Sequence, residues 1–154
     1  MRAVIQRVRY ARVRVEDRLV AAIGPGMLVL LGVAHGDEAD TADRLARKIA
    51  RLRIFDDEQG RMNLDSATIG GEFLVVSQFT LLADTRRGLR PSFTDAAPPS
   101  VAIALYERFM DRLRAAGGRV AAGQFGAHMQ VELLNDGPVT LVVDEPAAAS
   151  TPPR

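Results

Sequence analysis

Cysteine and tryptophan are absent from this 154-residue sequence, and Lys48 is its only lysine. The lack of cysteine excludes a disulfide framework and any chemistry that needs a thiolate. The two histidines, His35 and His128, stand outside the polar motifs described below, and we predict neither as a catalytic base. We therefore expect no metal and no cofactor, and a chemistry that depends on backbone groups, hydroxyls and the substrate itself.

Long hydrophobic runs and an excess of one charge are also missing. The longest apolar run, residues 27–34, is far shorter than the ~20 residues of a membrane helix. No N-terminal stretch resembles a secretion signal, so we expect a cytoplasmic protein without membrane contact. Twenty basic and nineteen acidic residues give a net charge of +1, which argues against DNA binding through bulk charge. Any RNA contact must therefore be local.

The hydrophobic pattern predicts a mixed α/β fold. Residues 11–15 alternate apolar and charged side chains, as a half-buried strand does, whereas apolar residues recur at helical spacing between Ala42 and Leu52. We expect a curved, barrel-like, mainly antiparallel sheet with two covering helices. The predicted strands are 3–15, 19–23, 27–31, 73–76, 129–134 and 139–143, and the predicted helices are 37–52 and 98–117.

The same pattern predicts one domain over residues 1–143. Residues 144–154 are rich in alanine, proline, serine and threonine and contain little that could be buried. We therefore predict a disordered tail over 144–154.

Two short polar segments carry most of the functional signal. Ser77, Gln78, Phe79 and Thr80 follow a buried strand pattern, at the kind of position where α/β folds place ligands. One interpretation is a strand end whose hydroxyls bond to the nearby backbone. The other is that N–H groups around Phe79 and Thr80, with Gln78 beside them, stabilise the oxyanion of a tetrahedral intermediate.

The second segment contains Gly137 and Pro138 between two predicted strands. This pair is compatible with a simple turn. A glycine before a proline can also form a cis peptide, whose two carbonyls point the same way and can hold an ammonium group.

With these two segments, the chain resembles the D-aminoacyl-tRNA deacylases over residues 1 to about 143. The resemblance rests on seven stretches, of which the two polar segments are the most specific. The stretches are Ile5-Gln6-Arg7-Val8, Leu30-Leu31-Gly32-Val33, Arg53-Ile54-Phe55, Met62-Asn63-Leu64, Ser77 to Leu82, Arg90-Pro91-Ser92-Phe93 and Asn135 to Thr140.

The resemblance implies a cytoplasmic homodimer that hydrolyses the ester between a D-amino acid, or glycine mischarged on tRNA-Ala, and tRNA. The catalytic segment would be residues 77–80 of one subunit. Gly137 and Pro138, joined by a cis bond, would enter from the other and exclude L-amino acids, and Met129 would line the substrate site. The terminal ribose 2′-hydroxyl would assist, while Thr80 as a covalent nucleophile is the competing mechanism.

For the tRNA, the resemblance and the local charge indicate Arg7, Arg86, Arg87 and Arg90 as contacts. Solvated loop arginines, or an acidic partner for Arg7, are the alternatives. Two other functions remain open at this stage. One is a related L-alanyl-tRNA deacylase, in which threonine would replace Ser77, and the other is a tRNA-binding module without catalysis.

Overall fold

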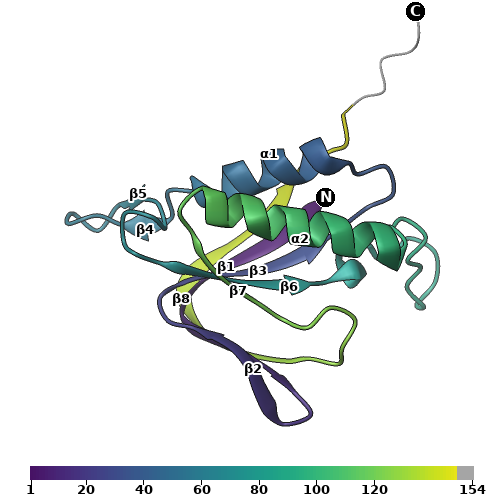
Figure 1. The fold of residues 1–154 in the computed structure, drawn as a ribbon, viewed down its shortest axis with the longest axis horizontal. Helices are drawn as coiled ribbons and strands as arrows, with labels where there is room; N and C mark the ends of the chain where they lie inside the picture. Colours follow the sequence, from purple (N-terminus) through teal and green to yellow (C-terminus); the bar gives the residue numbers. More distant parts are fainter. Residues whose placement is uncertain (149–154) are drawn as a thin grey trace, which may run out of the picture.

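The computed structural model describes residues 1–148, and over this range a six-stranded mixed sheet forms the centre of the fold (Figure 1). Its strands run in the order β2-β1-β3-β6-β7, and β8 pairs with β1. The pairs β1–β2, β1–β3 and β1–β8 are antiparallel, whereas β3–β6 and β6–β7 are parallel. The strands are β1 (Arg2–Val15), β2 (Arg18–Ile23), β3 (Gly26–Gly32), β6 (Glu72–Ser77), β7 (Arg119–Ala122) and β8 (Gln130–Asp144).

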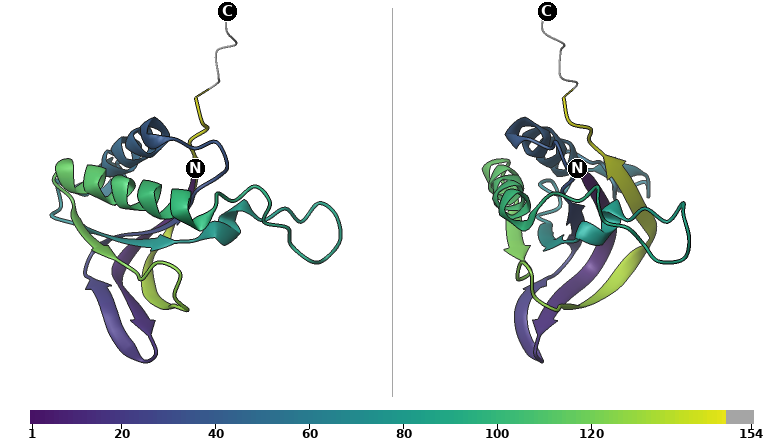
Figure 2. Two further views of the ribbon diagram at one scale, coloured as in Figure 1. Left: turned by 45° about the vertical axis from the view of Figure 1, so that its right-hand side comes forward. Right: turned by 90° about the vertical axis from the view of Figure 1, so that its right-hand side faces the viewer.

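Two helices lie side by side across one face of this sheet (Figure 2). Helix α1 (Ala39–Ala50) begins with a capping box between Glu38 and Thr41, and α2 (Pro99–Ala115) begins at a proline. Asp43 of α1 accepts hydrogen bonds at 2.7 Å from Arg108 of α2, which ties the helices together. A separate small sheet, β4 (Phe55–Asp56) with β5 (Met62–Leu64), projects beyond the end of α1.

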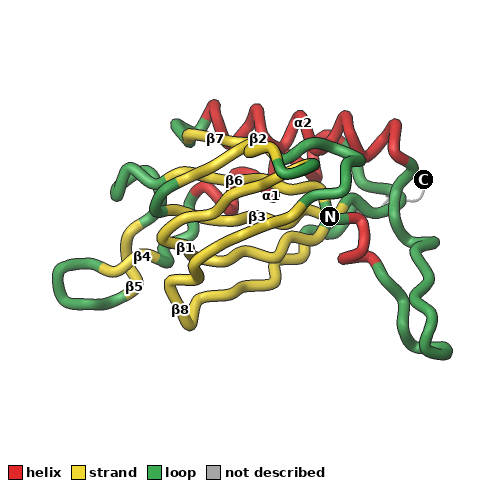
Figure 3. Tube along the Cα trace, turned by 90° about the horizontal axis from the view of Figure 1, so that it is seen from below, coloured by secondary structure: helices red, strands yellow, loops and turns green. Residues whose placement is uncertain are grey.

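The curvature of the sheet creates two hydrophobic clusters. On the helix side, Ala3 and Ile5 of β1 pack with the inner faces of α1 and α2. Farther along β1, Val8, Ala11 and Val13 face the interior of the curl instead. Register shifts between β1 and β8 on either side of Val8 allow this change of face. Figure 3 shows the long strands β1 and β8 following this curve together.

The predicted fold class is therefore confirmed, with some corrections of detail. The two strands predicted between residues 129 and 143 are one continuous strand, β8, which begins at Gln130, because Gly137 and Pro138 lie in a bulge of that strand. The sequence pattern did not predict β7 or the β4–β5 pair, which are too short to show a period.

The predicted tail also begins too early. Asp144 ends β8, and the Glu145 carboxylate accepts hydrogen bonds from Arg44 and Lys48 of α1, both at 2.8 Å. These contacts show that burial of apolar groups is not needed to order the segment, because ion pairs and the strand ladder hold it. Residues 149–154 of the predicted tail lie outside the described residues.

Candidate active site

The first polar segment lies at the end of the central strand β6. Parallel strands on both sides cover the β6 backbone, and Ser77 is its last residue. The Gln78 N–H then donates to the Leu31 carbonyl of β3 at 2.8 Å. The chain turns immediately into a short 3₁₀ helix, η1 (Phe79–Leu82). Sheet pairing therefore holds this segment up to the residue before the helix.

Close packing of η1 on β3 depends on Gly32. A Cβ atom at this position would lie 2.4 Å from Leu82 Cδ2 and 3.1 Å from the Gln78 carbonyl oxygen. The motif Leu30 to Val33 therefore supplies both strand and contact surface: its apolar residues fill the core, and its glycine admits η1.

Side chains within the segment are also held. Gln78 Nε2 donates to Thr80 Oγ1 at 2.5 Å. The Phe79 ring, 56% exposed, meets the Phe93 ring edge to face at a centroid distance of 5.1 Å. Phe93 belongs to the loop between η1 and α2, so this contact links that loop to η1.

Beside β6 and η1 lies a cleft of about 400 Å³, which we call the β6 cleft. Three of the predicted catalytic residues, Ser77, Gln78 and Phe79, line it together with the predicted substrate-binding residue Met129. Thr80 is exposed next to them and is bonded to Gln78. The remaining lining residues are Val76, Pro99, Phe125, Gly126, Ala127, His128 and Val131.

The wall formed by residues 125–131 was not predicted, apart from Met129. Its sequence carries no motif. The only signal is Gly123, because an added Cβ atom at this position would lie 2.7 Å from Met129 Sδ. The missing side chain leaves room for Met129 beside Val76. The half-buried Phe125, Ala127 and Met129 alternate with exposed neighbours and give this wall its apolar surface.

Tyr106 of α2 fixes the relative position of the two walls. Its hydroxyl donates to the Val75 carbonyl of β6 at 2.9 Å, and the Gly123 N–H donates to the same carbonyl at 3.0 Å. Burial of the phenol raises the pKa of Tyr106 to about 12. The hydroxyl therefore remains a hydrogen-bond donor throughout the physiological range.

Gly137 and Pro138 do not line the β6 cleft of their own chain. Their peptide bond is cis, as expected, and both residues are exposed. They lie in the bulge of β8, where residues 136–139 face the single residue Arg7 of β1. The Asn135 side chain closes the bulge by donating to the carbonyls of Arg7 (2.9 Å) and Val139 (3.3 Å).

Arg7 is the structural support of this bulge. Its guanidinium, in a residue that is 8% exposed, donates to the carbonyls of Asp136 (2.9 Å) and Ile54 (2.7 Å) and to the Asp56 carboxylate (3.2 Å). Nε and Nη1 of Arg7 are thus bound inside the protein, and contact of Arg7 with tRNA stays a prediction. The alternative with an acidic partner is the one that the contacts support.

The loop between η1 and α2 projects from the body of the molecule (Figure 2) and carries the other predicted arginines. Arg86 pairs with Asp84 at 2.7 Å, and this pairing holds the pKa of the Asp84 carboxyl far below its usual range. Arg87 and Arg90 are exposed on either side of Leu89, which is fully exposed. The loop therefore offers cations and one apolar side chain to solvent.

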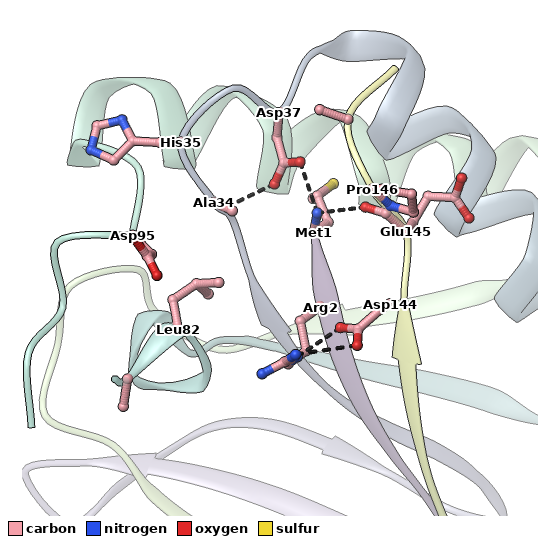
Figure 4. A pocket seen from close by; sticks show the side chains of 12 residues that line it. Met1, Arg2, Ala34, His35, Asp37, Leu82, Asp95, Asp144, Glu145 and Pro146 are labelled. Atoms are coloured by element: carbon pink, nitrogen blue, oxygen red, sulfur yellow. Dashed lines mark hydrogen bonds and ion pairs between the residues drawn. The ribbon is translucent and has the colours of Figure 1, made fainter. Parts of the chain in front are cut away.

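A second hollow of about 460 Å³ borders η1 through Leu82 and is shown in Figure 4. There the Arg2 guanidinium bonds to Asp144 at 2.7 Å and to the Leu81 carbonyl at 3.3 Å. The Met1 ammonium group donates to the Asp37 carboxylate at 2.8 Å. The two Arg2 contacts anchor the C-terminal end of η1 to β1 and β8. Residues of this hollow therefore hold η1, the segment that borders the β6 cleft.

Across residues 1–148 the structure shows no group of three or more histidine, cysteine or carboxylate side chains placed to hold a metal ion. Within the same range, no helix combines the length and the apolar character that a membrane crossing requires.

Comparison with known proteins places this geometry in a family. Residues 4–144 match the family described as D-Tyr-tRNA(Tyr) deacylase. A D-aminoacyl-tRNA deacylase of Roseiflexus castenholzii is 60% identical over 144 residues, which cover 94% of this chain and 92% of that protein.

Two solved structures share the fold. One, described as "c-Myc DNA Unwinding Element Binding Protein", has 40% identity and a TM-score of 0.89, and the match covers 96% of this chain and 100% of the other. The second, described as a probable eukaryotic D-amino acid tRNA deacylase, has 18% identity and a TM-score of 0.82 over 92% and 97% of the two chains. The family match over residues 4–144 and the 60% identical relative show that the protein belongs to the D-Tyr-tRNA(Tyr) deacylase family.

Proposed function

We propose that this protein hydrolyses the ester bond of D-aminoacyl-tRNA and of glycine mischarged on tRNA-Ala, releasing the free amino acid and tRNA. The observation that carries the proposal is the β6 cleft, where Ser77, Gln78 and Phe79 meet Met129 in a chain of this family. Water adds to the ester carbonyl, the bond from the carbonyl carbon to the ribose oxygen breaks, and that oxygen receives a proton from the added water to become a hydroxyl.

The cleft suits the terminal adenosine of tRNA. Its walls include the half-buried Phe125, Met129 and Val131, which offer an apolar surface to a purine. Ser77 and Gln78 form the polar end, next to η1. With the base against the walls, the ribose and its ester reach the polar end.

Backbone N–H groups at the start of η1 are the proposed oxyanion donors. Phe79 and Thr80 are its first two residues, and the first N–H groups of a helix have no acceptor within that helix. They lie beside the Gln78 amide, close to where the ester carbonyl would sit. One such donor contributes about 10²–10³ to the rate in other hydrolases.

A covalent role for Thr80 is the weaker alternative. Its hydroxyl accepts a hydrogen bond from the Gln78 amide, and an amide cannot remove a proton. We therefore assign proton transfer to the ribose 2′-hydroxyl of the substrate. Thr80→Ala should keep much of the activity, whereas a 2′-deoxy terminal adenosine should abolish it, and the reverse pattern would favour Thr80 as the nucleophile.

Chiral selection is proposed to require a homodimer. In this arrangement Gly137 and Pro138 of one subunit enter the β6 cleft of the other, where their carbonyls bind the α-ammonium group and leave no room for an L side chain. A D side chain then points away from the protein, so its identity matters little. Glycine has no side chain to exclude.

The exposed surface supports such a dimer. Strand β8 forms an edge of the described sheet, because β1 is the one described strand with which it pairs. On the sheet face opposite the helices, Val142 of β8 pairs with Val4 of β1 and is 65% exposed. Val142→Arg should shift the protein to monomers in analytical ultracentrifugation and reduce deacylation; an active monomer would contradict the shared site.

The decisive experiment compares D- and L-tyrosyl-tRNA with purified protein after treatment with a chelator, followed to complete release of the amino acid. Rapid loss of the D-ester alone is the expected result. Inertness toward both esters, with retained tRNA binding, would indicate a binding module, and cleavage of L-alanyl-tRNA alone would indicate the related deacylase. Excess duplex DNA should not inhibit, since the net charge is near neutral.

A further inference from the structure

A third hollow, distinct from the one at Arg2 and Met1, adjoins the β6 cleft and extends it toward the tip of the β1–β2 hairpin. We call it the hairpin hollow. Its volume is about 460 Å³, and it shares Ala127 and His128 with the cleft. Its remaining lining residues are Val15, Glu16, Asp17, Arg18, Gln124 and Gln130. An RNA strand that leaves the cleft past Ala127 and His128 therefore enters the hollow directly.

The hairpin tip has a defined shape. Glu16 and Asp17 have φ values of 48° and 62°, the left-handed conformation of a tight two-residue hairpin turn. The Arg14 guanidinium donates to the Asp17 carbonyl at 3.4 Å, and Arg14 pairs with Gln130 across the β1–β8 ladder. These contacts place the hairpin tip beside the start of β8, where both face the hollow.

The two cavities differ in chemistry. Apolar walls dominate the β6 cleft, whereas the hairpin hollow combines a guanidinium, two carboxylates and two carboxamides. Such a mixture fits neither a simple anion nor a simple cation. It does fit a cytidine with its phosphate, because the cytosine amino group donates to carboxylates, the carbonyl oxygen O2 accepts from amides, and arginine binds phosphate.

We infer that the hairpin hollow binds the cytidine next to the terminal adenosine of the tRNA acceptor end. In this arrangement Arg18 contacts the phosphate, while Gln130 and the carboxylates at the hairpin tip read the cytosine edge. The inference rests on the proposed function, because it requires the terminal adenosine in the β6 cleft. It adds a site of recognition, and it directs the acceptor strand toward the hairpin instead of the loop of Arg86, Arg87 and Arg90.

The test uses two small substrates, the D-tyrosyl ester of adenosine and that of cytidylyl-adenosine. For the unaltered protein, kcat/KM should rise about tenfold with the added cytidine, the size of effect expected for one well-read base. Arg18→Ala and Gln130→Ala should reduce this gain to less than about threefold and leave hydrolysis of the adenosine ester unchanged. Arg18→Lys should keep part of the gain, and the exposed Arg61→Ala on the β4–β5 loop is the matched control.

Thermal unfolding of each variant checks that it is folded. The inference is overturned if cytidine gives no gain, if Arg18→Ala and Gln130→Ala keep the full gain, or if Arg90→Ala removes the gain in their place. If neither small ester nor D-tyrosyl-tRNA reacts, the proposed function is overturned, and cytidine binding in the hairpin hollow with it. If both esters are hydrolysed at equal rates, only cytidine binding in the hairpin hollow is overturned.

Discussion

The two polar segments of this protein are built in opposite ways. Residues 77–80 follow a central strand and are held by sheet pairing, by Gly32 packing and by the Phe79–Phe93 contact. Gly137 and Pro138 lie on an edge strand, exposed, and are supported from one side by Arg7. Contacts within the same chain hold the first segment in place, whereas Gly137 and Pro138 of the second segment are exposed to solvent. This difference fits the proposal that the second segment acts on something outside its own chain.

The largest expected effect is that of Gly137→Ala. The new Cβ would lie 2.7 Å from Asn135 Oδ1, so the Asn135 side chain, which closes the bulge, must shift. A displacement of about 1 Å at a reacting centre can cost about 10²-fold in rate, and we expect a loss of that order with D-tyrosyl-tRNA. Gly24→Ala, whose Cβ would have an ordinary contact of 3.6 Å, is the matched control.

Steady-state kinetics and thermal unfolding of Gly137→Ala together separate two roles. A fall in stability or in dimer content without a selective loss of D-ester turnover would make the segment purely structural. In that case the contrast between the two segments would disappear.

Gly32→Ala tests the support of the first segment. Contact of the new Cβ with Leu82 Cδ2 at 2.4 Å should displace η1, lower deacylation about tenfold or more, and destabilise the fold by about 1–3 kcal/mol. Urea unfolding and kinetics measure the two effects. Retained activity in a destabilised variant would show that the position of η1 is not critical for the reaction.

Arg7→Met removes the support of the second segment. The substitution leaves the carbonyls of Asp136 and Ile54 without their donor, so we expect about 2–4 kcal/mol of destabilisation, measured by urea unfolding. An unchanged unfolding midpoint, together with a raised KM for D-tyrosyl-tRNA, would instead indicate that Arg7 contacts RNA.

The smallest effect concerns Asp43, which lies far from both segments. Hydrogen bonds from Arg108, and then from Arg112, lower its pKa from 3.8 to about 2. A carboxyl with a lowered folded-state pKa stabilises the protein above its unfolded-state pKa and loses this effect as the pH falls toward the folded value.

The difference in unfolding free energy between the unaltered protein and Asp43→Asn should therefore be constant at neutral pH and shrink between about pH 4 and pH 2. Its size should be about 1 kcal/mol or less, as for other pairs close to the surface. Unfolding curves at several pH values measure it, and a difference that grows on acidification would contradict the assignment.

The sequence was most informative where a signal was local. Alternation in β1 and the helical spacing of α1 gave elements whose observed bounds differ from the predicted ones by a few residues. Helix ends vary in this way because capping, and not hydrophobic spacing, decides them. Short pieces such as β7 have too few residues for a period, and sheet pairing alone defines them.

For the candidate site, the sequence identified Ser77, Gln78, Phe79 and Met129, and the fold brings these four to one cleft. It did not identify Phe125 or Ala127, because ordinary residues become walls only when the backbone places them. It also predicted that Arg7 contacts RNA, and only the structure shows that this arginine is buried.

The sequence by itself determined the fold class, the absence of thiol chemistry and the two polar segments, because composition, periodicity and local motifs follow directly from residue order. Only the tertiary structure decided which residues share a cleft, that Arg7 supports the β8 bulge, and that the hairpin tip adjoins the cleft. Contacts between residues more than a hundred positions apart depend on sheet register and curvature, which arise when the whole chain packs together.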